Sequence, residues 1–156
     1  ETMPLLEEYV FVIIGDGDIT EKLKNKVTNL SLVDSVKFLG KKTPNELKKL
    51  TPNATIGMSL EEDLGLNYRY ALPNKIFDYL HAHVPVIVSD LPEMRSLIKK
   101  HPIGEILIER TPKTLAKTII NMTKISYEKE LKTAKKELNW SKEKEKLISI
   151  FSKLDK

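Results

Sequence analysis

Short apolar runs alternate with helix-forming segments along most of the chain, and this alternation constrains the fold more than any other feature. Five such runs are rich in β-branched and aromatic residues, and their lengths suit β-strands. Continuous apolar runs indicate strands buried on both faces, and intervening helices of roughly 10 to 15 residues indicate parallel pairing. The sequence therefore predicts an α/β fold with a doubly wound, mostly parallel, Rossmann-like sheet. We expect its strands at residues 9–14, 36–39, 54–60, 85–89 and 103–108.

The helix starts carry recognisable signals. Asp18–Glu21 and Thr43–Glu46 both have the spacing of a capping box, in which two side chains satisfy free main-chain N–H groups. These helices are expected to end near Leu30 and Thr51. Three further helices open at prolines. We expect them at residues 73–83, 92–100 and 112–124.

The two ends of the chain carry separate expectations. Residues 126–156 are expected to form C-terminal helices interrupted at residues 139–141. In the last helix one face is expected to pack on another surface, because apolar residues recur there at helical spacing: Leu147, Ile148, Phe151 and Leu154. Residues 1–8 resemble the end of a helix, and a Rossmann-like half normally has one more strand before this point. We therefore expect residues 1–156 to be a fragment of a longer protein that lacks its first strand.

Composition sets broad limits on function. The 156 residues suit one domain, with 40% hydrophobic and 31% charged residues. The chain has no cysteine, which favours a reducing cytoplasm and excludes a thiolate metal site. A net charge of +4 is too mild to predict nucleic-acid binding. The lysine-rich last third is best interpreted as a solvated helical face, and weak association with the inner face of the membrane is the alternative.

Ligands of open α/β sheets bind outside the carboxyl ends of the strands, so the loops there are the candidate site. They are Gly15–Asp18, Gly40–Thr43, Leu60–Leu72, Ser89–Leu91 and Glu109–Thr111. Gly15 and Gly17 form part of a G-x-G-x-x-G pattern, but Thr20 replaces its last glycine. This turn is equally explained as a tight connection between a strand and a helix.

The helix that opens at Pro73 is the stronger candidate. Free N–H groups and the helix dipole at a helix amino end favour an anion. The N–H groups of Asn74, Lys75 and Ile76 are expected among these free donors, and the side chain of Lys75 adds positive charge. Asp78 lies one turn after Asn74 on the same face, where a carboxylate can bind a ribose diol. An ordinary amphipathic helix remains the alternative.

Two other clusters of polar residues are weaker candidates. His81 and His83 diverge by roughly 200° on a helix, so no metal site is predicted there. The acidic run Glu61-Glu62-Asp63 is most simply a solvated loop, although a loop at this edge can also face a sugar. Glu61 and Glu62 are therefore weak candidates for catalytic residues.

Several segments together resemble the C-terminal, donor-binding half of a GT-B fold, family 4 glycosyltransferase of the bacterial polysaccharide-biosynthesis type. The most specific is the stretch from Leu72-Pro-Asn-Lys to Ser89-Asp-Leu-Pro92. The resemblance covers nearly the whole chain. The other matching segments are residues 12–17, residues 36–40 and Trp140-Ser141.

The resemblance implies a retaining hexosyltransferase that uses a nucleotide-diphosphate sugar, with no tightly bound cofactor and no metal. It places the base at the main chain of Lys41 and Lys42, and the diphosphate at Pro73, Asn74 and Lys75. It implies that a separate N-terminal domain, missing from this chain, binds the glycan or lipid-linked acceptor. The fragment alone is then expected to be inactive.

One position departs from the family pattern and keeps other functions open. Asp78 corresponds to the second acid of the family's E-x(7)-E motif, which binds the ribose, but Tyr70 stands where the first Glu is expected. The alternatives are a non-catalytic nucleotide-sugar-binding module and a GT-B sugar-nucleotide epimerase.

Overall fold

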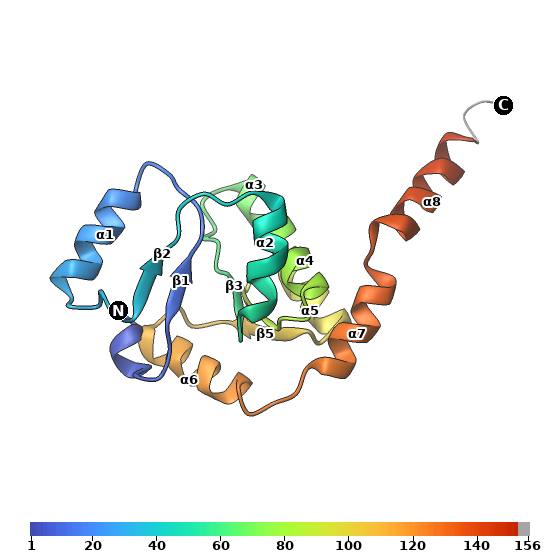
Figure 1. The fold of residues 1–156 in the computed structure, drawn as a ribbon. Coiled ribbons are helices and arrows are strands. Elements are labelled where there is room, and N and C mark those ends of the chain that lie inside the picture. The colour runs from blue at the N-terminus through green and yellow to red at the C-terminus, as the bar shows by residue number, and fades with distance from the viewer. Residues whose placement is uncertain (153–156) are drawn as a thin grey trace.

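The computed structural model describes residues 1–152 as an α/β fold in which every strand pair is parallel (Figure 1). β1 (Phe11–Ile13) pairs with β2 (Val36–Phe38), and this pair forms a sheet of its own. β3 (Gly57–Ser59), β4 (Val86–Ser89) and β5 (Gly104–Leu107) form a second sheet in that order. The predicted parallel α/β class is confirmed, and each strand lies inside its predicted range. The strands are divided between two sheets, where the sequence predicted one.

The helices follow the predicted alternation. The first six helical elements are the 3₁₀ turn η1 (Met3–Leu5), α1 (Thr20–Asn29), α2 (Pro44–Leu50), the 3₁₀ turn η2 (Thr51–Asn53), α3 (Leu66–Arg69) and α4 (Asn74–His81). The remainder are α5 (Pro92–Lys100), α6 (Pro112–Met122), α7 (Glu128–Glu137) and α8 (Trp140–Phe151). α3 is a short helix inside the loop predicted at Leu60–Leu72. The predicted break near residue 139 is confirmed, because it separates α7 from α8.

Of the two predicted capping boxes, one is confirmed and one is wrong. The Thr43 hydroxyl accepts from the N–H of Glu46 at 3.3 Å, and the Glu46 carboxylate accepts from the N–H of Thr43 at 2.8 Å. α1 begins only at Thr20, and its N-cap residue carries no side-chain cap. The preceding turn continues one residue further than predicted, and the Thr20 hydroxyl accepts from the N–H of Gly17 at 3.0 Å.

The hydrophobic core surrounds the three-stranded sheet. All four residues of β4 are buried, as expected for a central strand with helices on both faces. The neighbouring helices supply the rest of the core. The largest of the almost completely buried side chains are Ser59, Ile76, Leu80, Val84, Val86, Ile87, Val88, Met94, Ile103, Met122 and Leu131.

α8 extends away from the rest of the molecule (Figure 1). Leu147, Ile148 and Phe151 are exposed, so the predicted packing of this face is not observed within residues 1–152. Leu154 lies outside the described residues. None of the helices in residues 1–152 combines the length and apolar character that a bilayer crossing needs.

Candidate functional site

The carboxyl ends of β3, β4 and β5 meet at one edge, where side chains join the loops that follow them. The hydroxyl of Ser89, at the end of β4, donates to the main-chain oxygen of Glu61 at 2.6 Å. Arg110, beyond β5, donates to the oxygens of Leu60 and Glu61 at 2.8 and 2.6 Å. Arg110 also lies 3.3 Å from the Ser89 hydroxyl. These bonds hold the start of the acidic loop against the sheet.

Arg110 was not predicted as a site residue. Its loop was expected at this edge, but an exposed Arg after a strand carries no motif. Arg110 holds the acidic loop by donating to carbonyl groups that come 49 and 50 residues earlier in the sequence. Only the position of residues 109–111 after the last strand could have indicated it.

Each carboxylate of the acidic run has a basic partner, so the interpretation as a solvated loop is wrong for its first member. Glu61 is the most buried of the three, with a side chain 17% exposed. The ion pairs are Glu61–Lys75 at 2.5 Å, Glu62–Arg110 at 3.8 Å and Asp63–Arg69 at 2.6 Å. The acidic loop is thereby connected to α4, to the end of β5 and to α3.

The environment of Glu61 favours its charged form. Burial alone would raise the pKa of this carboxyl, but hydrogen bonds from Lys75 and from the Ser59 hydroxyl, at 2.8 Å, outweigh burial. The pKa of Glu61 therefore lies below its usual value. The result is a carboxylate, fixed at the carboxyl edge, beside the amino end of α4.

The amino end of α4 differs slightly from the prediction. Pro73 has an extended conformation and precedes the helix as its N-cap, and Asn74 is the first helical residue. The N–H of Ile76 already donates to the oxygen of Pro73 at 3.1 Å, so Ile76 is not a free donor. Within residues 1–152 the N–H groups of Asn74 and Lys75 have no such bond.

The two faces of α4 are as expected. Asn74, Lys75 and Asp78 are exposed, whereas Ile76 and Leu80 are buried and Phe77 packs against the core. The predicted diphosphate and ribose residues therefore share an accessible surface. Lys75 differs from the prediction in one respect, because its ammonium group is already paired with Glu61.

The remaining predicted residues lie on other loops. The turns after β1 and β2 touch, since the N–H of Gly15 donates to the oxygen of Gly40 at 2.9 Å. Lys41 is exposed, and Lys42 is partly buried beside it. Tyr70 ends α3 with an exposed side chain. Among the hydrogen bonds and ion pairs of residues 1–152, none joins Gly17, Lys41, Lys42 or Tyr70 to α4.

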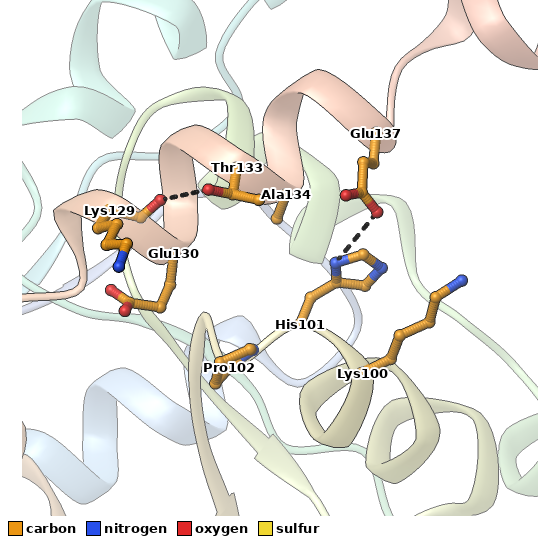
Figure 2. Close-up of a pocket in the computed structure, with 8 residues that line it drawn as sticks. All are labelled: Lys100, His101, Pro102, Lys129, Glu130, Thr133, Ala134 and Glu137. Atoms are coloured by element: carbon orange, nitrogen blue, oxygen red, sulfur yellow. Dashed lines mark hydrogen bonds and ion pairs between the residues drawn. The ribbon is translucent and has the colours of Figure 1, made fainter.

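A cavity of about 210 Å³ lies between the end of α5 and α7 (Figure 2). His101, which precedes β5, is buried there, and its Nδ1 lies 3.9 Å from a Glu137 oxygen. Its Nε2 has no hydrogen-bond partner. The cavity lies at the amino end of β5, opposite the edge with Glu61 and Arg110, so it is separate from the candidate site. Its lining residues are Lys100, His101, Pro102, Lys129, Glu130, Thr133, Ala134 and Glu137.

Residues 1–152 contain no group of three or more His, Cys, Asp and Glu side chains arranged to hold a metal ion. His81 and His83 lie on either side of the end of α4. His83 contacts Lys135 of α7, with 3.0 Å between Nε2 and Nζ. This contact is part of the packing of α7 on α4.

Solved structures with the same arrangement define the class of fold, which is that of GT-B glycosyltransferases. The Anabaena protein Alr3699/HepE, in complex with UDP and glucose, has a TM-score of 0.75 and 16% sequence identity over 97% of this chain. Its complex with UDP-glucose has a TM-score of 0.74. WaaG, a glycosyltransferase involved in lipopolysaccharide biosynthesis, has a TM-score of 0.60 over 81% of this chain.

The family follows from the sequence itself. The model of the family "Glycosyl transferases group 1" matches residues 1–146, and this chain belongs to that family. A search of curated proteins finds no match. The chain spans 44% of the length of the HepE structures and 32% of the WaaG structure.

Proposed function

We propose that this chain is the C-terminal, donor-binding half of a retaining, family 4 type glycosyltransferase that uses a nucleoside-diphosphate sugar. The observation that carries the proposal is the amino end of α4. There the N–H groups of Asn74 and Lys75 stand at the carboxyl edge of the sheet, beside the Lys75–Glu61 ion pair. Membership of the glycosyl transferases group 1 supports the reaction class, and the UDP and glucose in the HepE complex support the donor class.

The chemistry required of these residues is electrostatic. As the sugar leaves, negative charge develops on the nucleoside diphosphate, and oriented N–H groups and a lysine stabilise that charge. Lys75 in its pair with Glu61 is held close to the helix end, so the diphosphate competes with Glu61 for the ammonium group. Asp78, one turn further along the exposed face, binds the ribose, and the turn from Gly40 to Lys42 accommodates the base.

The roles of the other residues follow from their loops. Gly15 and Gly17 allow the chain after β1 to approach the donor closely, because no side chain projects from them. Glu61 and Glu62 lie nearest the sugar. Pro73 directs the chain into the helix that carries the N–H donors.

The rest of the protein's biology belongs to the same proposal. A separate N-terminal domain binds the acceptor, a growing surface polysaccharide or lipid-linked glycan, so residues 1–156 alone bind nucleotide weakly and transfer no sugar. The protein is cytoplasmic and associates peripherally with the inner face of the membrane.

A non-catalytic nucleotide-sugar-binding module is the second candidate, and Tyr70 is the observation that favours it. This tyrosine occupies the motif position of the expected sugar-contacting Glu. Asp78→Asn and Glu62→Gln, introduced into the full-length protein, separate the two candidates. Unchanged glycan synthesis in cells favours the binding module, and loss of synthesis favours the transferase. Epimerised donor without acceptor would instead indicate an epimerase.

Isothermal titration calorimetry of the full-length protein with UDP and GDP tests the donor site. We expect binding of at least one nucleotide, weakened about tenfold in both Lys75→Met and Asp78→Asn, which corresponds to about 1.4 kcal/mol. Lys132→Met is the matched control, because Lys132 pairs with Glu128 on the exposed face of α7. If neither UDP nor GDP binds to a folded sample, the assignment of this site is wrong.

A further inference from the structure

The Lys75–Glu61 ion pair occupies the lysine that the proposed diphosphate site needs. The Lys75 ammonium group lies 2.5 Å from Oε1 of Glu61. Lys75 is the second residue of α4, so this ammonium group belongs to the same helix end as the N–H groups of Asn74 and Lys75. A diphosphate at this helix end therefore meets a carboxylate that already binds the same ammonium group.

Glu61 is the fixed partner of the pair. Oε2 of its carboxylate accepts from the hydroxyl of Ser59 at 2.8 Å, and Ser59 is completely buried at the end of β3. The main-chain oxygen of Glu61 accepts from Ser89 and from Arg110, each at 2.6 Å. Glu61 is thus bonded to the sheet edge through both its main chain and its side chain, and a shift away from this edge would break several hydrogen bonds.

Lys75 is the partner that can move. Its side chain is 46% exposed, whereas that of Glu61 is 17% exposed. In the part of the chain that the structure describes, Glu61 is the one ion-pair partner of its ammonium group. A lysine ammonium group is carried on a flexible stem. Lys75 can therefore turn from Glu61 to an anion at the helix end, and Glu61 cannot follow it.

We propose that Glu61 is an internal competing anion, which holds Lys75 unless a nucleoside diphosphate displaces it and so weakens the binding of that diphosphate. The competition presupposes the donor site of the proposed function and adds a residue that opposes binding there. Glu61 acts through Lys75 and needs no contact with the nucleotide.

Displacement of Lys75 changes the protonation of Glu61. Burial raises the pKa of this carboxyl, and the hydrogen bond and charge of Lys75 oppose that effect. The other charged neighbours are Glu62 and Arg110, and Arg110 is directed to main-chain oxygens and to Glu62. Once Lys75 turns away, the Ser59 hydroxyl is the remaining side-chain donor to the carboxylate. The pKa of Glu61 then rises, so diphosphate binding is coupled to proton uptake and is favoured as the pH falls.

Product release is the step at which this competition matters most. After the sugar has left, the nucleoside diphosphate has an additional ionisable oxygen, so the ammonium group of Lys75 holds the product more tightly than the donor. Glu61 stays within reach of that ammonium group and offsets the added attraction. The affinity for the product is thereby kept low, which shortens the time that the product occupies the site.

Isothermal titration calorimetry of the full-length protein with UDP and GDP tests the competition. We expect Glu61→Gln to tighten nucleotide binding about tenfold at pH 7, because no charged hydrogen bond to Lys75 has to be broken. In a Lys75→Met background the same change should tighten binding by no more than about twofold. Glu128→Gln is the control for net charge, because Glu128 pairs with Lys132 on the exposed face of α7. This control should leave the affinity within about twofold of the wild type.

The outcomes distinguish the competition from the donor site itself. Nucleotide binding that is no tighter in Glu61→Gln than in the wild type would overturn the competition and leave the donor site standing. An equally large gain in the Lys75→Met background would also overturn it, because Glu61 would then repel the nucleotide directly. If neither UDP nor GDP binds to any folded variant, the donor site is wrong and the competition fails with it.

Proton uptake gives a test that does not depend on the folding of Glu61→Gln. Calorimetry of the wild-type protein near pH 5, in two buffers of different ionisation enthalpy, measures the protons taken up on binding. UDP-glucose and GDP-glucose are the probes, because their diphosphates have no group that titrates near this pH. We expect net uptake with the probe that binds, and none in Lys75→Met. Binding without proton uptake, or the same uptake in both proteins, would contradict the displacement of Lys75 from Glu61.

Discussion

Lys75 and Glu61 show how a single pair of side chains can serve both stability and binding. The Glu61 side chain is 17% exposed and that of Lys75 is 46% exposed, so the pair spans the boundary between the sheet edge and solvent. Removing the lysine leaves a largely buried carboxylate with one hydrogen bond fewer, which costs more than an exposed pair contributes.

The pair predicts a pH dependence of stability. The folded pKa of Glu61 lies below its ordinary value of 4.5, so its stabilising contribution is present above that pH and is lost as the pH falls through the folded pKa. We expect Lys75→Met to cost about 1–2 kcal/mol at pH 7. The variant should also flatten the loss of stability as the pH falls below 4.5. Urea denaturation across this pH range measures both quantities.

The controls for that experiment separate the pair from general acid effects. Glu61→Gln should also flatten the profile, because it cannot titrate. Lys132→Met, in the exposed pair with Glu128, should change stability by less than about 0.5 kcal/mol. A steep wild-type profile that persists unchanged in Lys75→Met would show that Glu61 is not responsible.

Arg110 supports a second prediction at the scale of one residue. It bonds to the main-chain oxygens of Leu60 and Glu61, so Arg110→Gln leaves both acceptors without a charged donor. We expect a loss of about 1–2 kcal/mol in the free energy of unfolding, measured by urea denaturation. Arg69→Gln, which breaks only the exposed pair with Asp63, should cost about 0–1 kcal/mol. Equal costs for the two variants would mean that Arg110 does not hold the acidic loop.

Among the helices, α1 and α4 end in the same way, at a residue with a left-handed backbone. Each is followed by a non-glycine residue with a left-handed backbone, Ser31 at φ 55° and His83 at φ 60°. In each case two reverse bonds close the helix, such as those from Ser31 to Thr28 and from His83 to Leu80. Glycine normally takes this position, because it adopts positive φ without strain.

His83 differs from Ser31 in having a partner. Burial and the charges of Lys135 and Lys132 lower the pKa of His83, so its neutral ring can accept a hydrogen bond from Lys135. We therefore expect Ser31→Gly to stabilise the protein by about 0.5–1 kcal/mol and His83→Gly to gain less. In a Lys135→Met background the two gains should become equal, which denaturation of the double variants measures. A His83→Gly gain that is unaffected by Lys135→Met would contradict this account.

Elements also show where prediction from sequence succeeded. The Thr43–Glu46 capping box was predictable because both partners lie within four consecutive residues. The same pattern failed at Asp18, because the turn after β1 continues past this residue and α1 begins only at Thr20. The exposed and buried faces of α4 were predictable from spacing. The pairing of Lys75 with Glu61 was not, because it joins a helix to a loop 14 residues earlier.

At the scale of the whole molecule, α8 extends away from the other elements, and its apolar side chains are exposed within residues 1–152 (Figure 1). Trp140, the only tryptophan in the sequence, is 69% exposed at its start, and Lys142, Lys144 and Lys146 follow. Proposed peripheral membrane association makes this helix the natural contact, because apolar side chains and lysines suit an anionic lipid surface.

Tryptophan fluorescence tests that association directly. We expect vesicles with anionic phosphatidylglycerol to shift Trp140 emission to the blue, and high salt to reduce the effect. Zwitterionic phosphatidylcholine vesicles are the control and should produce no shift. Absence of a shift with anionic vesicles would remove α8 as a membrane contact.

By itself, the sequence determined the parallel α/β class, the positions of the five strands along the chain, and which face of α4 is buried. These depend on local periodicity and on capping over a few residues. Three features were decided by the tertiary structure alone. They are the division into two sheets, the hydrogen bonds from Arg110 to the acidic loop and the exposure of β1. Those features arise from hydrogen bonds and contacts between distant segments, which residue periodicity along the chain does not record.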